Sequence, residues 1–307
     1  MTNSLLRNII FTVAYYDVLG YPMTSFEIWK YLINMQGAEE DPIFSLEDVF
    51  KELEKEEIKN HIDEYRGFYF LKGKKDLVEQ RICGDKISNR KIKKAQKITT
   101  WLRLIPFIKM IAVAGRVGSK NAQVGSDIDM LIIFKHGKIF TGRFLATVAT
   151  HFLGQRRHKN KITNRICLNH FLSDKCDISV RDLYSAHSYV FTFPLYGGKF
   201  YQNFFKENNW IKKYRPNFLF LENNAKEIFD DKFSFWIRRI LEIIFRPDFF
   251  EKVLKKWQVK KIKNNPLTGK AGGVIIYNDF ELAFWPDFEN QGPKIFEEFK
   301  GKSLSGS

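Results

Sequence analysis

Asp127 and Asp129 are the residues of this chain whose types and spacing point most directly to chemistry. They flank Ile128 at the head of an apolar run that ends at Phe134. Residues i and i+2 of a strand point to the same face, so both carboxylates can aim at one point while Ile128 faces the core. Paired carboxylates suit Mg²⁺ or Mn²⁺, which also takes phosphate oxygens from a substrate. The pair is therefore predicted to be a catalytic metal site.

A glycine turn precedes this pair and completes the pattern. An apolar run ends at Ala114, Gly115–Ser119 follow, and Ser126 stands directly before Asp127. Glycines let backbone N–H groups approach phosphates closely, more so where a helix starts. An Asp-x-Asp pair alone is more often a turn or surface feature. With these flanks it predicts a site that holds a nucleoside triphosphate and one or two metal ions for displacement at the α-phosphate.

The segment Val113–Phe134 resembles the polymerase-β-like nucleotidyltransferase superfamily, in which a strand, a Gly-Ser turn and a spacer precede Ser-Asp-x-Asp on the next strand. A longer similarity, to a group of nucleotidyltransferase-domain proteins, covers most of residues 108–299. Its further segments are Asn164–Leu172, Leu183–His187, Pro194–Tyr196 and Gly272–Phe299. The resemblance implies a nucleotidyltransferase fold. It also implies Mg²⁺-dependent transfer of a nucleotidyl group from a nucleoside triphosphate, such as ATP, to a hydroxyl acceptor.

Two positions depart from the family pattern. The family has serine after the first glycine of the turn, where this chain has Arg116, whose guanidinium either clamps phosphate or blocks the pocket. Active members usually carry a third carboxylate on a later strand. The strand predicted at Ile166–Leu172 presents Asn169 there, and an amide can ligate a metal but is a poor general base. Asp174 and Asp177 are the nearby substitutes.

These considerations define a set of predicted site residues and leave the activity open. The predicted catalytic residues are Asp127, Asp129 and Asp174, and the predicted nucleotide-binding residues are Gly115, Arg116, Gly118, Ser119, Ser126 and Asn169. The leading function is a nucleotidyltransferase, with RNA, protein or a small molecule as the acceptor. One alternative is a non-catalytic nucleotide-binding regulator or scaffold. The other is a nucleic-acid-binding protein that uses the basic segments 81–104 and Gln155–Arg165.

Residues 1–79 are predicted to form a winged helix-turn-helix-like domain. Two helical patterns run through residues 4–34, Ser45 can cap a third helix, and short strands are predicted at Ile58–Ile62 and Phe68–Leu71. The net charge of this region is −6, and phosphate repulsion would oppose DNA reading. A protein-docking module is therefore favoured over a DNA-binding one.

Residues 80–106 are predicted to be a basic connector helix, with Ser88 as a candidate N-cap. Segment 81–104 contains eight basic residues against the single acid Asp85. Two interpretations stay open for this charge. The first is a solvated helix face, and the second is an electrostatic lip for a nucleic acid or for nucleotide phosphates.

Residues 107–220 are predicted to form the nucleotidyltransferase domain. Apolar runs predict strands at Phe107–Ala114, Ile128–Phe134 and Ile166–Leu172, and Phe140–Leu153 has helical periodicity. Strands alternating with helices indicate an α/β layer. The predicted fold class is thus α+β or α/β, with a small mixed sheet flanked by helices.

Residues 221–307 are predicted to be a helical region carrying a β-hairpin at Gly272–Ala283. Segment 233–263 mixes aromatic and aliphatic residues with Arg and Lys. The favoured interpretation is packing on the core with a basic outer face, with Trp236 and Trp257 buried. The alternative is an amphipathic helix at a membrane surface.

Composition adds limits to these predictions. The chain has 307 residues and a net charge of +15, of which the part after residue 79 carries +21, as suits a phosphate-bearing ligand. The three cysteines, Cys83, Cys167 and Cys176, show no paired spacing, so a reducing, cytoplasmic location is expected. We expect no signal peptide and no membrane span. The acidic N-terminal region is the candidate site for a protein partner.

Overall fold

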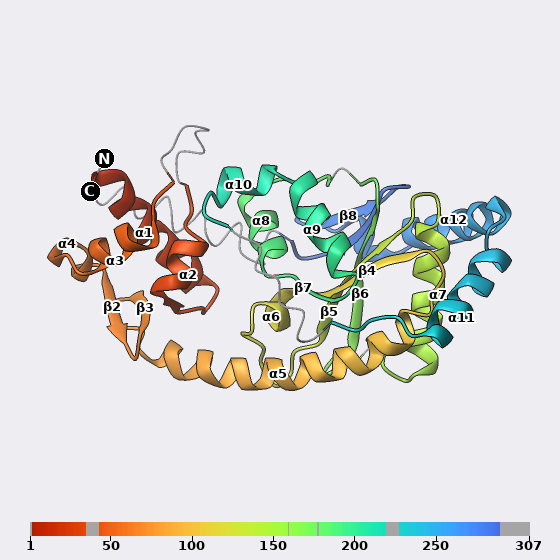
Figure 1. Ribbon diagram of the computed structural model, residues 1–307, viewed down its shortest axis with the longest axis horizontal. Helices are drawn as coiled ribbons and strands as arrows, with labels where there is room; N and C mark the ends of the chain where they lie inside the picture. The colour runs from red at the N-terminus through yellow and green to blue at the C-terminus, as the bar shows by residue number, and fades with distance from the viewer. Residues whose placement is uncertain (1, 35–42, 159, 177, 219–226, 289–307) are drawn as a thin grey trace.

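The computed structural model describes residues 2–34, 43–158, 160–176, 178–218 and 227–288. Within them, twelve α-helices accompany a three-stranded antiparallel sheet and a six-stranded mixed sheet, so the chain is a mixed α+β protein. The long helix α5 (Asp76–Leu102) runs beneath both sheets, from the N-terminal helices to the opposite end of the molecule (Figure 1). It is the element that both parts share.

The N-terminal part surrounds the small sheet with short helices. Its strand order is β1-β3-β2. Ser45 caps its helix as predicted, because its hydroxyl accepts from the backbone N–H of Asp48. The strand predicted at Ile58–Ile62 is wrong, since Ile58 is the buried residue of a helical turn and the strand starts only at Ile62. The elements are α1 (Thr2–Val18), β1 (Met23–Thr24), α2 (Ser25–Lys30), α3 (Leu46–Leu53), α4 (Glu56–Lys59), β2 (Ile62–Tyr65) and β3 (Phe68–Leu71).

Helix α5 begins earlier than predicted and divides its positive charge between two faces. It starts at Asp76, so Ser88 is not its N-cap; the Ser88 hydroxyl lies inside and accepts from the backbone N–H of Ala122. Three basic side chains are buried, which neither interpretation of the connector anticipated. They are Arg81, Lys91 and Arg103. The exposed ones follow one helical face as a solvated stripe of Lys86, Arg90, Lys93 and Lys97.

The six-stranded sheet has the order β7-β4-β5-β6-β9-β8. β5 runs antiparallel to β4 and parallel to β6, and parallel neighbours need a crossover, which helix α7 supplies. The three predicted strands, the helix near residues 140–153 and the late hairpin are confirmed. The elements are β4 (Ile108–Val113), α6 (Gly115–Gly118), β5 (Ile128–Phe134), α7 (Ile139–Phe152), β6 (Ile166–Ser173), α8 (Leu183–Val190), β7 (Phe193–Tyr196), α9 (Gly198–Glu207), α10 (Trp210–Tyr214), β8 (Val274–Tyr277) and β9 (Glu281–Trp285).

Strand β5 lies at the centre of the core, with apolar side chains on both faces. Leu131 and Ile133 belong to the cluster shared with the N-terminal helices, while Met130 and Ile132 belong to the cluster shared with α5 and α7. The alternation follows from the two-residue period of a strand. Asp129 has the same parity as Leu131, and it lies where this face reaches the edge of the core.

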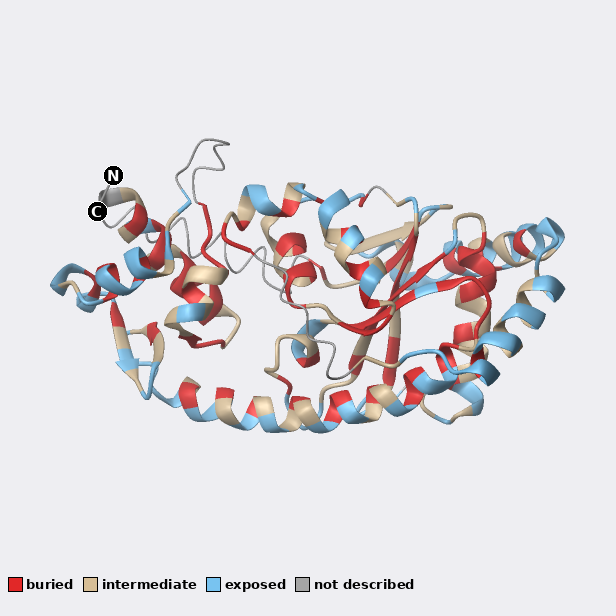
Figure 2. Cartoon of the chain, in the orientation of Figure 1, coloured by how far each residue is buried: buried red, intermediate tan, exposed pale blue. Residues whose placement is uncertain are grey.

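Two further helices, α11 (Lys232–Ile244) and α12 (Asp248–Lys263), precede a short 3₁₀ turn (Pro266–Gly269) and the hairpin. The prediction that Trp236 and Trp257 are core residues is wrong, because they are 65% and 51% exposed. Figure 2 shows how much of both helices is exposed. No helix in the described ranges is long and apolar enough to cross a membrane.

Candidate active site

A cavity of about 1190 Å³ opens beside the start of β5. Its walls come from the turn after β4, the first residues of β5 and β6, helix α8, one side of α12 and the β8–β9 hairpin. Of the predicted site residues, Gly118 and Asp174 are not among its walls. Those that line it are Gly115, Arg116, Ser119, Ser126, Asp127, Asp129 and Asn169.

Asp127 and Asp129 converge in this cavity. One carboxylate oxygen of each, together with the Sγ of Cys167, lies within 4.8 Å of the others. Asp129 is opposite Cys167 in the parallel pairing of β5 with β6, which explains why the three groups meet. The geometry expected from the i, i+2 spacing therefore holds for the two carboxylates.

Gly115 allows the turn to approach this pair. Its φ of 59° lies in the left-handed region, and a Cβ there would come 2.5 Å from Oδ2 of Asp129. The backbone N–H of Ala114 donates to the carbonyl of Asp129 over 2.9 Å and fixes the distance between turn and strand. Gly118 is required for a different reason. A Cβ at this position would lie 2.3 Å from the carbonyl oxygen of Phe191. It is a packing glycine outside the cavity.

Arg116 is exposed and lines the cavity beside the two carboxylates. No hydrogen bond or ion pair of its guanidinium occurs among the described residues, so its donors are available to a ligand. Ser119 donates its hydroxyl to the carbonyl of Arg116, and Ser126 accepts from the backbone N–H of Gln123. These two serines mainly shape the loops around the site.

The pKa of Asp129 is raised to about 7, first by burial and second by the charge of Asp127. Hydrogen bonds from Cys167 and Asn169 and the charge of Arg157 oppose the rise. Nδ2 of Asn169 donates to Oδ1 of Asp129 over 3.0 Å, so Asn169 faces the site as predicted. A proton or a metal cation would relieve the repulsion between the two carboxylates.

Cys167 was not among the predicted site residues, although it stands two residues before Asn169 on one strand and so shares its face. Burial and the nearby aspartates raise its pKa, which keeps the thiol protonated. A neutral thiol is a poor ligand, and two carboxylates with an amide are hard-oxygen donors. This donor set fits Mg²⁺ or Mn²⁺ better than Zn²⁺.

Arg157 is the second residue that sequence reasoning missed. It lies in the basic loop Gln155–Arg165, and its Nη1 donates to Oδ2 of Asp127 over 2.6 Å. An isolated bridge between Arg156 and Ile166 holds the loop against β6. Arg157 thus places one positive charge beside the two carboxylates. A metal ion bound to Asp127 would have to share this carboxylate with the guanidinium of Arg157.

Lys91 is a third missed residue and acts from helix α5. Its buried Nζ donates to the carbonyl of Ser126 over 2.7 Å and to Oδ1 of Asn164 over 2.6 Å. It thereby fixes the loop that leads into Asp127. The signal was present in the sequence, since Lys91 shares a helical face with Ser88 and Ala95.

Asp174 is not brought together with the other predicted site residues. The register pairs Asp129 with Cys167 but Phe134 with Ser173, so Asp174 lies at the far end of the strands. There its Oδ1 accepts from the backbone N–H of His136 over 2.7 Å and stabilises the turn after β5. Asp177 lies outside the described residues.

Two histidines, His170 and His187, lie in the cavity wall and make contacts within the protein. His170 is buried, and its Nε2 lies 3.2 Å from Oε1 of Glu281. His187 packs among aromatic rings in the cavity wall, where burial and then the charge of Arg215 lower its pKa to about 3. It is therefore neutral at physiological pH and does not act as a charged phosphate ligand.

No protein-family model, curated protein or solved structure matches this chain.

Proposed function

We propose that this protein is a metal-dependent nucleotidyltransferase with a polymerase-β-like fold, which transfers a nucleotidyl group from a nucleoside triphosphate to a hydroxyl acceptor. One observation carries the proposal. Asp127 and Asp129 aim at one point of a large cavity, directly beside the left-handed turn at Gly115. The cavity, at about 1190 Å³, has room for a triphosphate and part of an acceptor.

Each wall residue has a role in this proposal. Asp127 and Asp129 would hold Mg²⁺ or Mn²⁺, and the metal would supply charge stabilisation at the phosphate that reacts. Arg116 presents unpaired donors to the β- and γ-phosphates. Arg157 neutralises Asp127 before the metal arrives and can then turn to a phosphate oxygen, because its side chain is partly exposed.

The N-terminal part fits a winged-helix module that docks a protein. Support comes from the strand order β1-β3-β2 among four helices and from the acidic surface of α3, where Glu47, Asp48 and Glu54 are exposed. An acidic surface repels DNA and suits a basic protein partner. Free thiols at Cys83, Cys167 and Cys176 support a cytoplasmic location.

The direct test is incorporation of label from α-³²P-labelled nucleoside triphosphates in the presence of Mg²⁺ or Mn²⁺. Asp127→Asn and Asp129→Asn should each lower the rate by about 10²–10³-fold, the amount expected when several kcal/mol of charge stabilisation is lost. Asp174→Asn is the matched control, because the same change outside the cavity should leave the rate unaltered. Incorporation that survives both site changes contradicts the proposal.

A second candidate function is a non-catalytic nucleotide-binding regulator. The observation that favours it is Asn169, which hydrogen-bonds Asp129 at the position where active members of the resembled family carry a third carboxylate. Titration calorimetry separates the two functions. Nucleotide binding that needs no divalent metal and is not followed by turnover supports the regulator, whereas metal-dependent binding with turnover supports the enzyme.

A further inference from the structure

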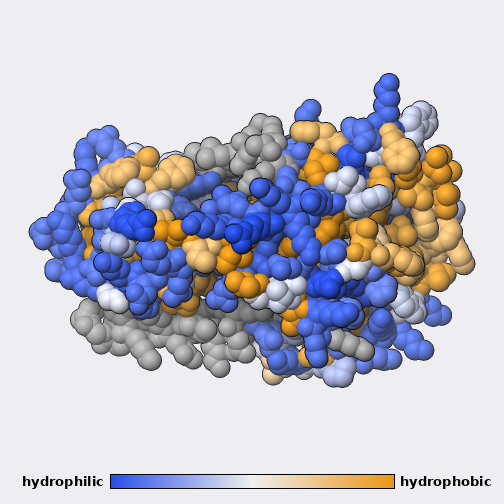
Figure 3. Space-filling view, turned by 90° about the horizontal axis from the view of Figure 1, so that it is seen from below, coloured by the Kyte–Doolittle hydropathy of each residue, from blue (hydrophilic) through white to orange (hydrophobic). Residues whose placement is uncertain are grey.

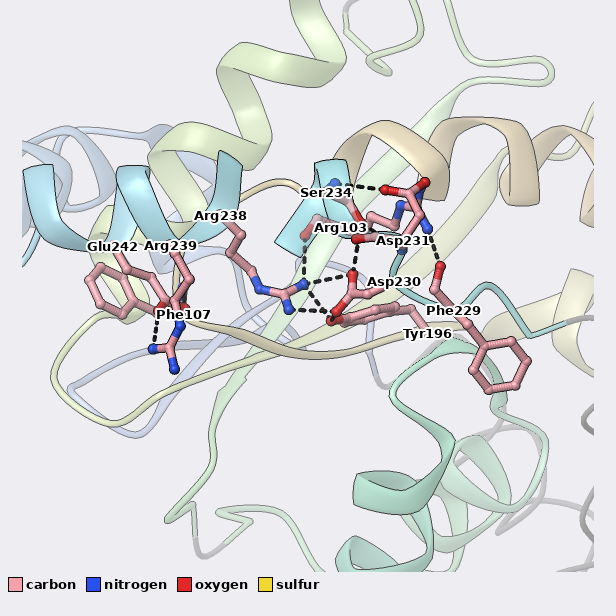
Figure 4. Close-up of polar contacts among 10 residues, drawn as sticks. All are labelled: Arg103, Phe107, Tyr196, Phe229, Asp230, Asp231, Ser234, Arg238, Arg239 and Glu242. Atoms are coloured by element: carbon pink, nitrogen blue, oxygen red, sulfur yellow. Dashed lines mark hydrogen bonds and ion pairs between the residues drawn. The ribbon is translucent and has the colours of Figure 1, made fainter. Parts of the chain in front are cut away.

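Helix α11 faces the rest of the protein with polar groups. Nη1 of Arg238 donates to the hydroxyl of Tyr196 over 2.6 Å and to Oδ1 of Asp230 over 2.9 Å, and Nη2 of Arg103 donates to Oδ2 of Asp231 over 2.7 Å (Figure 4). A helix that only packs on a core does the opposite and turns its apolar stripe inward. The polar contacts fix α11 in place and leave its apolar side free.

The outer face of α11 is apolar and exposed. Its residues recur at intervals of three and four, which places them on one side of the helix. Trp236 is 65% exposed and Ile243 is 72% exposed. The full set is Phe233, Trp236, Ile240, Ile243 and Ile244. Figure 3 shows apolar side chains gathered at this end of the molecule.

Helix α12 continues the same arrangement. Its inner side is held by Glu251, whose carboxylate accepts from the backbone N–H groups of Phe140 and Thr141 at the start of α7. Its outer side exposes an aromatic and aliphatic row at four-residue spacing. This row consists of Phe249, Val253 and Trp257, of which Trp257 also borders the cavity beside β5.

Lysines share the outer side of α12 with this row. Four of them are exposed at helical spacing, namely Lys252, Lys256, Lys260 and Lys263. With about 100° of rotation per residue, Lys260 points in nearly the same direction as Phe249 and Val253, but it lies two to three turns further along the helix. None of these four lysines takes part in the ion pairs found among the described residues of α11 and α12. The four lysines and Lys255 also line a shallow groove of about 450 Å³.

We propose that these exposed residues of α11 and α12, the α11–α12 surface, bind an anionic lipid bilayer as an interfacial anchor. Trp, Phe and Ile side chains would enter the boundary between headgroups and acyl chains, and the lysines would meet lipid phosphates. A second copy of the chain fits less well, since a two-fold interface would set the two lysine rows against each other. The acidic N-terminal region lies at the opposite end (Figure 1), so an anionic surface attracts one end and repels the other.

The test is co-sedimentation of the full-length chain with vesicles. The wild type should sediment with phosphatidylcholine vesicles that contain phosphatidylserine, and not with phosphatidylcholine alone, and added salt should weaken binding. Ile240→Glu with Ile243→Glu should abolish it. Lys256→Glu with Lys260→Glu should weaken it at least tenfold, since each basic residue near an anionic surface contributes about a factor of five.

Two matched controls keep the test specific. Lys86→Glu with Arg90→Glu makes the same charge change on the exposed stripe of α5, and Ile43→Glu replaces one exposed isoleucine by glutamate at the acidic end. Both should bind as the wild type does. Thermal melting must show that every variant is folded, as expected for exposed positions. Quenching of tryptophan fluorescence by brominated lipid should fall in Trp236→Phe.

Three results would overturn the proposal. One is a wild type that does not sediment with anionic vesicles. Another is an equal loss of vesicle binding in the α5 control, which would mean that binding depends only on the net charge of the protein. The third is a dimer, detected by light scattering without lipid, that Ile240→Glu dissociates while vesicle binding is unchanged. That result would assign the α11–α12 surface to a second copy.

Discussion

Strand β5 and helix α11 are both rich in isoleucine and aromatic or aliphatic residues, but they use them in opposite ways. β5 is covered by β4 and β6 at its edges and by an apolar cluster on each face, and all its residues except Asp129 are buried. α11 faces the protein through Arg238 and leaves Ile240 and Ile243 exposed. Apolar content alone therefore does not locate a segment in the core. Whether an apolar face is buried depends on which residues pack against it.

The largest expected effect tests this contrast with one substitution at two places. Ile132→Asp should abolish stable folding, because a carboxylate at a fully buried position costs more than about 4 kcal/mol. Ile240→Asp should change the free energy of unfolding by less than about 0.5 kcal/mol, since more than half of the residue is exposed and no polar group is left unpaired. Urea denaturation followed by circular dichroism gives both values. Similar losses at the two positions would break the comparison.

The next effect concerns the two kinds of left-handed glycine in the chain. Gly115→Ala and Gly137→Ala both place Cβ at positive φ, which should cost about 1 kcal/mol of stability at Gly137 and more than that at Gly115, where the Cβ also clashes. Only at Gly115 does the new Cβ meet a carboxylate, whereas nothing lies within 4 Å of one at Gly137. Calorimetric titration with Mn²⁺ should therefore show weaker binding in Gly115→Ala alone. Equal metal affinity in both variants would show that the turn at Gly115 does not affect metal binding.

A further effect should come from the polar contacts that hold α12. Glu251→Gln removes the charge that meets the start of α7, and should lower stability by about 1–2 kcal/mol, because the acceptor is buried. Asp248→Asn, on the same helix but exposed, should cost less than about 0.5 kcal/mol. Denaturant midpoints measure both. If the two changes lower the free energy of unfolding equally, the hydrogen bonds of Glu251 do not hold α12 against α7.

A pH-dependent effect is expected at Asp129. Its pKa is raised to about 7 in the folded protein, against about 4 in an unfolded chain, so the folded state binds the extra proton between these values. Stability of the metal-free wild type should therefore fall as pH rises through this window. Asp129→Asn cannot ionise, so its melting temperature should exceed that of wild type by a few degrees above pH 7 and match it near pH 4. A variant whose melting temperature differs from that of wild type by the same amount at every pH would contradict the raised pKa of Asp129.

Much of the sheet and half of the site could be predicted from sequence, because both depend on local periodicity. The apolar runs around Ile132 gave the strands, and the two-residue period gave the convergence of Asp127 with Asp129. Asp174 was predicted to join them because it follows the right strand, but position along a strand depends on register. The register puts it at the other end of the sheet.

The residues that were missed reach the site from elements distant in sequence. Arg157 arrives through a loop that an isolated bridge holds to β6, and Lys91 arrives from a helix more than thirty residues upstream of Ser126. The face that Lys91 shares with Ser88 and Ala95 indicates burial, but nothing local in either segment indicates which residue is the partner. The burial predicted for Trp236 and Trp257 was wrong for a related reason. Helical periodicity defines an apolar face, but it does not say whether anything covers that face.

Helix α5 has a consequence for how the molecule tolerates change. At about 1.5 Å per residue, its 27 residues form a rod of about 40 Å. Arg81 holds Tyr21 of the N-terminal region, Lys91 holds the loop before Asp127, and Arg103 holds the start of α11. One residue inserted between Arg81 and Lys91 would rotate the rest of the helix by about 100° relative to Arg81. The hydrogen bonds of Lys91 and Arg103 could then no longer form together with those of Arg81. The length of this rod is therefore under stricter constraint than the identity of its solvent-facing side chains.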